Sequence, residues 1–167
     1  MSRAERGRLN GLLHKSEIRR PKSEFEKEQE AYAGYMVTWV TWVTWPEWAS
    51  LTLQSKPLTC GDSEPEPDVA IVRGAEEDFW QDHPRTAELV IEVCVSSHEY
   101  DRSKLRAYVS AAVKECWFVL GAEKQIEVYQ RPVGGQYTVH NTHGPGGSLA
   151  CWAVPEFSLD LDKFFAK

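Results

Sequence analysis

The sequence contains no apolar run approaching the roughly 20 residues that a membrane-spanning helix needs, and its start lacks the pattern of a secretory signal peptide. These two absences argue against a helical membrane protein and predict a cytoplasmic one. A chain of 167 residues with 42% hydrophobic and 26% charged residues is long enough for one domain, with values ordinary for a globular protein.

The sequence also lacks any C-x-x-C pair. Its four cysteines are Cys60, Cys94, Cys116 and Cys151. This spacing argues against a cysteine zinc site or a disulfide framework. Cys94 and Cys116 lie in apolar runs, where a thiol behaves as a small hydrophobic group. The pair His140 and His143 has no further candidate ligands around it, so we predict no zinc site there.

Positive charge is scarce outside the first 22 residues. Residues 1–22 hold seven basic and two acidic side chains, a net charge of +5, which leaves −11 for the rest of a chain whose total is −6. An acidic body is a poor partner for a polyanion unless the basic segment or a local groove supplies the contacts. We interpret residues 1–22 as a basic N-terminal tail and residues 23–167 as a single domain.

Local patterns predict an α/β fold. Residues 23–35 are typical of a helix, with a capping box from Ser23 to Glu26 and a stop at Gly34. A second helix is predicted after Ser96, reaching about Val113. Strands are predicted at 51–55, 68–72, 88–95 and 115–120, and as a hairpin at 125–130 and 136–141. A helix between two buried strands indicates a mixed sheet flanked by helices, in the order helix–strand–strand–strand–helix–strand plus a C-terminal hairpin.

Residues 37–45 repeat the triplet VTW three times. A period of three matches neither a strand nor a helix, so apolar groups fall on both faces. The run favours a strand buried on both sides. The alternative is an aromatic surface on which nucleic-acid bases stack.

Three polar residues stand out against this pattern. Asp68 opens the apolar run DVAIV, Glu92 lies inside the apolar run ELVIEVCV, and Lys104 follows on the predicted helix. Burying a carboxylate is costly without a partner, and a metal ion or a lysine would serve as one. Two carboxylates suit Mg²⁺, and a lysine can stabilise negative charge that develops on a phosphate. The two acids can meet if their strands are antiparallel neighbours.

A purely structural interpretation also exists for each residue. An acid at a strand start after a proline is often a turn or cap residue, as Asp68 would be. Lys104 could pair with Asp101 on an exposed helix face. Arg102 and Arg106 have the pattern of solvated charges on that helix.

The order of these motifs resembles the Uma-two endonuclease family of the PD-(D/E)XK, restriction-endonuclease-like superfamily. The resemblance runs from about residue 51 to 166, through PDVAIV, LVIEV, YDRSK, ECWFVL and VPEFSLDLDKFF. It implies a restriction-endonuclease-like core and metal-dependent hydrolysis of DNA phosphodiester bonds. Asp68 corresponds to the motif aspartate and Glu92 to the second acid, and the Val93 carbonyl would join them as a ligand of Mg²⁺ or Mn²⁺. The resemblance also implies a homodimer.

The sequence departs from the superfamily pattern in three places. Cys94 stands where the lysine is expected, so the resemblance assigns the catalytic lysine to Lys104 on the following helix. The spacing from Asp101 to Lys104 is one residue shorter than in the family. The first helix often supplies another acid, for which Glu24 and Glu28 are candidates. These departures leave a second hypothesis open, in which a nuclease-like fold that no longer cuts acts as a nucleic-acid-binding or protein-interaction module.

Overall fold

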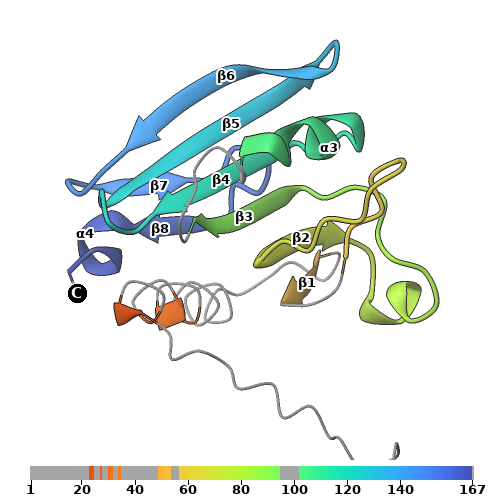
Figure 1. Ribbon diagram of the computed structural model, residues 1–167, viewed down its shortest axis with the longest axis horizontal. Coiled ribbons are helices and arrows are strands. Elements are labelled where there is room, and N and C mark those ends of the chain that lie inside the picture. The colour runs from red at the N-terminus through yellow and green to blue at the C-terminus, as the bar shows by residue number, and fades with distance from the viewer. Residues whose placement is uncertain are drawn as a thin grey trace, which may run out of the picture.

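A computed structural model describes the protein (Figure 1). The structure describes residues 23, 24, 27, 30, 31, 34, 49–53, 57–94 and 102–166. The predicted tail at 1–22, the VTW run at 37–45 and residues 95–101 lie outside these. No described helix is long and apolar enough to cross a membrane.

A six-stranded mixed sheet forms the centre of the described part, in the spatial order β1-β2-β3-β4-β5-β6. Its strands are β1 (Ala49–Leu53), β2 (Val69–Arg73), β3 (Leu89–Cys94), β4 (Glu115–Leu120), β5 (Gln125–Val133) and β6 (Gln136–His143). Only β3 and β4 pair in parallel, and every other neighbouring pair is antiparallel. A parallel pair needs a crossover, and α3 (Leu105–Ser110) supplies it.

The alternation of side chains along the strands divides the core into two apolar layers, one on each face of the sheet. Ile91 and Trp117 belong to one layer, and Val90 and Phe118 belong to the other. The strands β3 and β4 are buried along their whole lengths, which explains their nearly continuous apolar sequences.

The C-terminal segment covers the face that carries Trp117. It contains a small second sheet of β7 (Ser148–Ala150) and β8 (Ser158–Asp160), followed by the short helix α4 (Leu161–Phe164). The fully buried Glu115 ties this cover to β4, because it accepts hydrogen bonds from Ala153 N (2.9 Å) and from Nε1 of Trp117 (2.6 Å). The strands β7 and β8 were not predicted from the sequence, because their three-residue lengths leave no clear periodicity.

The opposite face is covered by α3, which packs Tyr108 into the layer that contains Phe118. The helix ends where Ala112 adopts a positive φ of 55°. Its closing hydrogen bond runs from the Val113 N–H to the Tyr108 carbonyl (3.0 Å). This left-handed conformation is the usual helix stop, but glycine normally occupies it.

The predicted fold class is confirmed: the chain is α/β with a mixed sheet and a hairpin of β5 and β6. The strand predicted at 51–55 begins two residues earlier, at Ala49. Every residue that the structure describes within the predicted first helix from Glu24 to Gly34 is helical. A single 3-10 turn, η1 (Glu76–Phe79), lies between β2 and β3.

The positive φ of Ala112 gives a stability prediction. Ala112→Gly should raise the free energy of unfolding by about 0.5–1 kcal/mol, because an alanine Cβ is strained at this φ and a glycine is not. Urea unfolding followed by circular dichroism measures it. Ala111→Gly is the matched control, since Ala111 has an ordinary φ of −83° and should gain nothing. A less stable Ala112→Gly variant would contradict the interpretation.

Candidate functional site

Asp68 and Glu92 lie on the same face of the sheet, beneath α3. The antiparallel ladder of β2 and β3 pairs Val69 with Ile91. Continuing this register by one residue places Asp68 opposite Glu92, and residues opposite one another point to the same face. The neighbours of Glu92 at alternate positions, Val90 and Cys94, belong to the layer beneath α3. The condition set by the sequence, that the two strands be antiparallel neighbours, is therefore met.

Glu92 is held by Tyr108 of α3 and by Lys104, the residue immediately before this helix. Lys104 Nζ donates to Glu92 Oε2 at 2.8 Å, and the Tyr108 hydroxyl donates to Glu92 Oε1. The carboxylate is only 4% exposed and the lysine 21%. Lys104 and Tyr108 are four residues apart and therefore lie on one face of the helical segment. The buried acid is thus satisfied from above by a cation and a hydroxyl.

Burial dominates the electrostatics of Glu92. Removal from water raises its pKa from an ordinary 4.5 to about 7, although Lys104 and the Tyr108 hydrogen bond act in the opposite direction. The negative charge of Asp68, which lies opposite Glu92 in the continued β2–β3 register, adds to the rise in pKa. Burial, together with Glu92, also raises the pKa of Tyr108, so this hydroxyl stays a proton donor.

Asp68 is fixed by the backbone of β3. The Val93 N–H donates to Asp68 Oδ2 at 2.7 Å. The contact joins the start of β2 to the end of β3 and orients the Asp68 side chain beside Glu92. The Val93 side chain is buried in the layer on the other face, so only its backbone is directed toward the acids. The structure therefore brings Asp68, Glu92, Val93 and Lys104 together.

The donor set fits a divalent cation that keeps much of its water. Each carboxylate oxygen has two lone pairs, so Glu92 retains acceptor capacity after binding Lys104 and Tyr108. Mg²⁺ commonly takes one or two carboxylates and completes its shell with water and substrate oxygens. No cluster of three or more His, Cys, Asp or Glu residues suited to a metal occurs among the described residues. The residues therefore fit an open, hydrated ion and not a closed protein cage.

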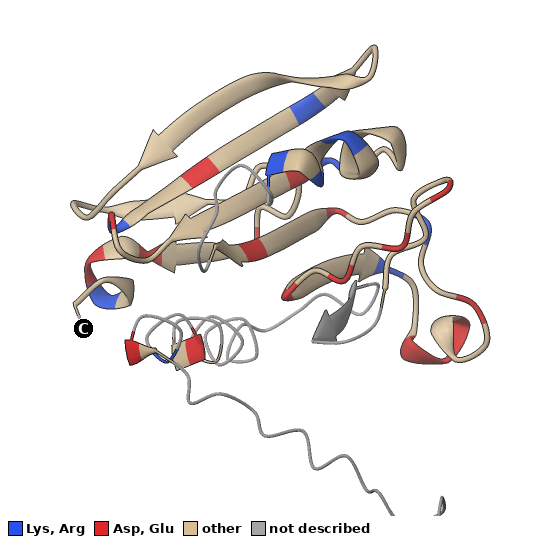
Figure 2. Cartoon of the chain, in the orientation of Figure 1, with Lys and Arg blue, Asp and Glu red and all other residues tan. Residues whose placement is uncertain are grey.

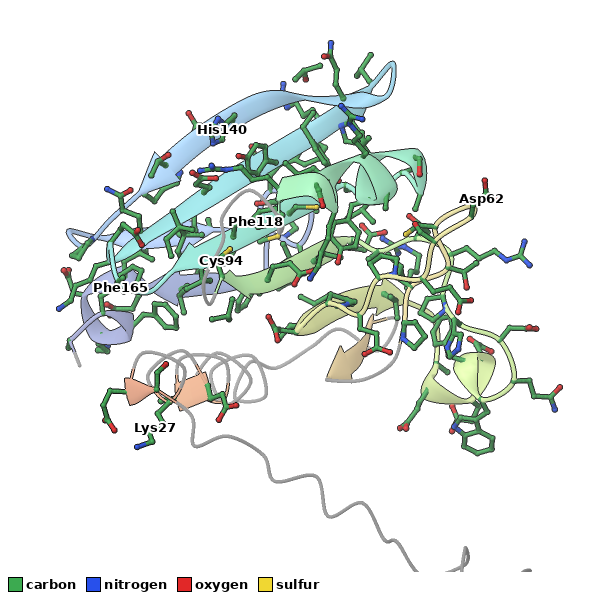
Figure 3. All side chains as sticks on the ribbon, viewed as in Figure 1. Lys27, Asp62, Cys94, Phe118, His140 and Phe165 are labelled. Atoms are coloured by element: carbon green, nitrogen blue, oxygen red, sulfur yellow. The ribbon has the colours of Figure 1, made fainter. Side chains whose placement is uncertain are left out.

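The remaining predicted candidates are less well placed. Glu24 is exposed and pairs with Lys27 on its own helix (2.5 Å), and Glu28 lies outside the described residues. Cys94 is buried at the end of β3 (Figure 3), in the apolar layer that contains Tyr108 and on the face where the superfamily lysine would project. His140 and His143 are three residues apart on β6 and face opposite sides of the sheet, so they cannot share a metal.

Two contacts at and beside the site were not predicted from the sequence. The helix predicted after Ser96 contains Tyr108, but the sequence did not reveal the Tyr108 hydroxyl as a partner of Glu92. Arg102 is exposed, as predicted, but its carboxylate partner was not predicted. Its guanidinium holds Glu127 through Nε (3.1 Å) and Nη2 (2.5 Å), across 25 residues of sequence. This pair depends on the strand register that brings β5 beneath the start of α3, so it is recognised only in the folded structure.

Comparison with known proteins places this chain in a family. The model of the Uma2 family, described as "Putative restriction endonuclease", matches residues 27–162. No curated protein matches the chain significantly.

Among solved structures, the fold is similar to the "Crystal structure of a putative nuclease belonging to DUF820 from Anabaena variabilis ATCC 29413". The TM-score is 0.68 at 16% sequence identity, over 87% of this chain and 82% of that one. An identity this low supports the shared fold alone. Because the family model spans most of the sequence, the chain belongs to the Uma2 family of restriction-endonuclease-like proteins.

Proposed function

We propose that this protein is a metal-dependent endonuclease that hydrolyses phosphodiester bonds of DNA. The observation that carries the proposal is the meeting of two carboxylates and a lysine on one face of the sheet. They come from the residue before β2, from β3 and from the N-cap of α3. Restriction-endonuclease-like families generally use divalent metal ions, and a nuclease family implies a nucleic-acid substrate. The proposal adds DNA as that substrate and Mg²⁺ or Mn²⁺ as the ion.

The side chains have separate tasks in this proposal. Asp68 and Glu92, with the Val93 carbonyl, would hold the ion. Such an ion would polarise the phosphate and lower the pKa of the attacking water. Lys104 is the nearest described cation to Glu92, and its charge would stabilise the negative charge that grows on the phosphoryl oxygens. Tyr108 holds the Glu92 carboxylate in orientation from the buried side.

A second candidate function is a nuclease-like module that binds but does not cut. Two observations favour it. Lys104 and Tyr108 already occupy both oxygens of Glu92, and Cys94 stands at the superfamily lysine position. Calorimetric titration with Mn²⁺ separates the two candidates, because an endonuclease should bind the ion and lose that binding in Asp68→Ala. A complete absence of Mn²⁺ binding would favour the module.

We also propose a homodimer as the functional assembly, in keeping with the resemblance to restriction endonucleases. Light scattering coupled to gel filtration tests it. A dimer would offer two sites related by a twofold axis, one for each strand of a duplex.

The first prediction from the proposed site concerns cleavage. Asp68→Ala and Lys104→Ala should each lower the rate of plasmid cleavage in Mg²⁺ or Mn²⁺ by about a hundredfold or more, because each removes charge at the reacting phosphate. Gel electrophoresis of the plasmid measures the rate. Glu77→Ala, which removes an exposed acid in η1, is the control and should cut normally. Absence of cleavage by the unmodified protein, or full activity in both site variants, would show the assignment to be wrong.

The second prediction uses the raised pKa of Glu92. Between pH 4.5 and about 7 the folded chain binds this proton more tightly than the unfolded chain does, so ionisation destabilises the fold as pH rises. Glu92→Gln carries no such charge. Its free energy of unfolding, relative to the unmodified protein, should therefore rise between pH 5 and pH 8.5, by up to roughly 3 kcal/mol.

Urea unfolding at the two pH values measures this difference, and titrations shared by both proteins cancel in it. Glu77→Gln, which removes an exposed carboxylate in η1, is the control for the loss of one acidic side chain. A Glu92→Gln variant whose relative stability is equal at both pH values would mean that Glu92 is not the buried titrating group.

A further inference from the structure

A second polar cluster lies beside the carboxylate site, in the same cross-strand row. The ladders pair Glu92 with Phe118, Phe118 with Glu127, and Glu127 with Thr142. All four side chains therefore point to the face beneath α3. Two interstrand spacings, or about 10 Å, separate Glu92 from Glu127. The row continues from the candidate site to the open edge of the sheet at β6 (Figure 1).

The Arg102 side chain is held at the surface by an ion pair with the buried carboxylate of Glu127. Glu127 is nearly buried and takes both Nε and Nη2 of the guanidinium, while 45% of the Arg102 side chain remains exposed. The hydrogen bonds from Arg102 lower the pKa of Glu127, and the Tyr129 hydroxyl adds a third donor at 2.9 Å. A guanidinium whose Nε and Nη2 are bound to a carboxylate has a fixed orientation. Its remaining N–H groups can donate to a phosphate.

An aromatic platform adjoins this arginine. Tyr129 and His140 are direct cross-strand partners, and their rings stack with centroids 4.2 Å apart and an interplanar angle of 6°. His140 lies on β6 and is exposed (Figure 3). Tyr129 is half-buried and stacks on one side of the imidazole. His140 is the diagonal neighbour of Glu127, about 7–8 Å away. That distance spans roughly two nucleotides of a stacked strand, at about 3.4 Å each.

The charge around this surface differs from that of the rest of the chain. Arg102, Lys104 and Arg106 are the only charged residues in the described segment 102–110. Figure 2 shows basic positions grouped along this segment, whereas acidic positions follow the loop before β2 and the turn η1. A local basic helix above an aromatic pair is the composition by which proteins track a single nucleic-acid strand.

We propose that Arg102 and His140 form a binding subsite for a single-stranded stretch of nucleic acid. Arg102 takes a backbone phosphate and the open face of the His140 ring stacks on a base. The subsite rests on the proposed function, because it names the form of the substrate that reaches Asp68 and Glu92. It deepens that function from DNA in general to a substrate with an unpaired segment, such as a frayed end or a flap.

Fluorescence anisotropy tests the subsite. A labelled single strand, its duplex and the RNA strand of the same sequence are titrated with the protein without divalent metal, at several salt concentrations. The single strand should bind more tightly than the duplex. His140→Ala should weaken binding of the single strand about tenfold, because it removes one stacking contact. Arg102→Gln should reduce the slope of log K against log salt by about 0.7, because one phosphate contact is lost.

Two matched variants separate this subsite from general effects. Arg85→Gln removes an equal charge from the exposed loop before β3, and His143→Ala removes an imidazole from the other face of β6. Both should bind like the unmodified protein. Thermal unfolding checks each fold. If Arg102→Gln is unfolded, Arg102→Lys keeps the charge without the planar fork and should bind the single strand less tightly.

Several outcomes would overturn the subsite: no binding of the single strand, equal losses in the test and matched variants, or unchanged affinity in His140→Ala and Arg102→Gln. The plasmid assay stays independent of these outcomes. Cleavage by a protein whose subsite variants bind normally would remove the subsite and leave the endonuclease proposal. Variant-sensitive binding without cleavage would support the subsite and remove the endonuclease proposal.

Discussion

The burial of Glu92 is the constraint around which the described fold is arranged. A carboxylate in the central strand of a sheet is tolerated only if its charge and hydrogen-bonding capacity are met. Here Lys104, at the N-cap of α3, and Tyr108, within α3, meet both requirements above the strand. The crossover that makes β3 and β4 parallel therefore also supplies the partners of the acid. Fold and candidate site share one requirement, which is the position of this short helix.

The same face of the sheet combines an apolar layer with a polar row. Phe118 separates the pair of Lys104 and Glu92 from the pair of Arg102 and Glu127. Two carboxylates on adjacent strands would repel each other, whereas an intervening aromatic residue keeps the two ion pairs apart. The start of α3 is thus fixed at two points of one row, which limits both its rotation and its shift along the sheet.

The sequence predicted the parts of this site whose signals are local. A carboxylate within VIEVCV is conspicuous, and the strands around it have clear patterns. The resemblance to a nuclease family then grouped Asp68 and Lys104 with Glu92 in one candidate site. Contacts between distant segments were not predictable. Glu127 lies in an alternating strand where an acid is ordinary, so nothing in the sequence indicated that Arg102 would bind it.

The C-terminal cover of the sheet has a consequence for synthesis of the protein. Residues 149–165 supply one side of the apolar layer that contains Trp117. They also include Ala153, whose backbone N–H donates a hydrogen bond to Glu115. Until those residues leave the ribosome, one face of the central strands has no cover. At about 5–20 residues per second, the nascent chain carries that exposed apolar face for seconds. A chaperone that binds extended apolar strands could bind this face during that interval. It would be displaced when the C-terminal segment packs on the sheet.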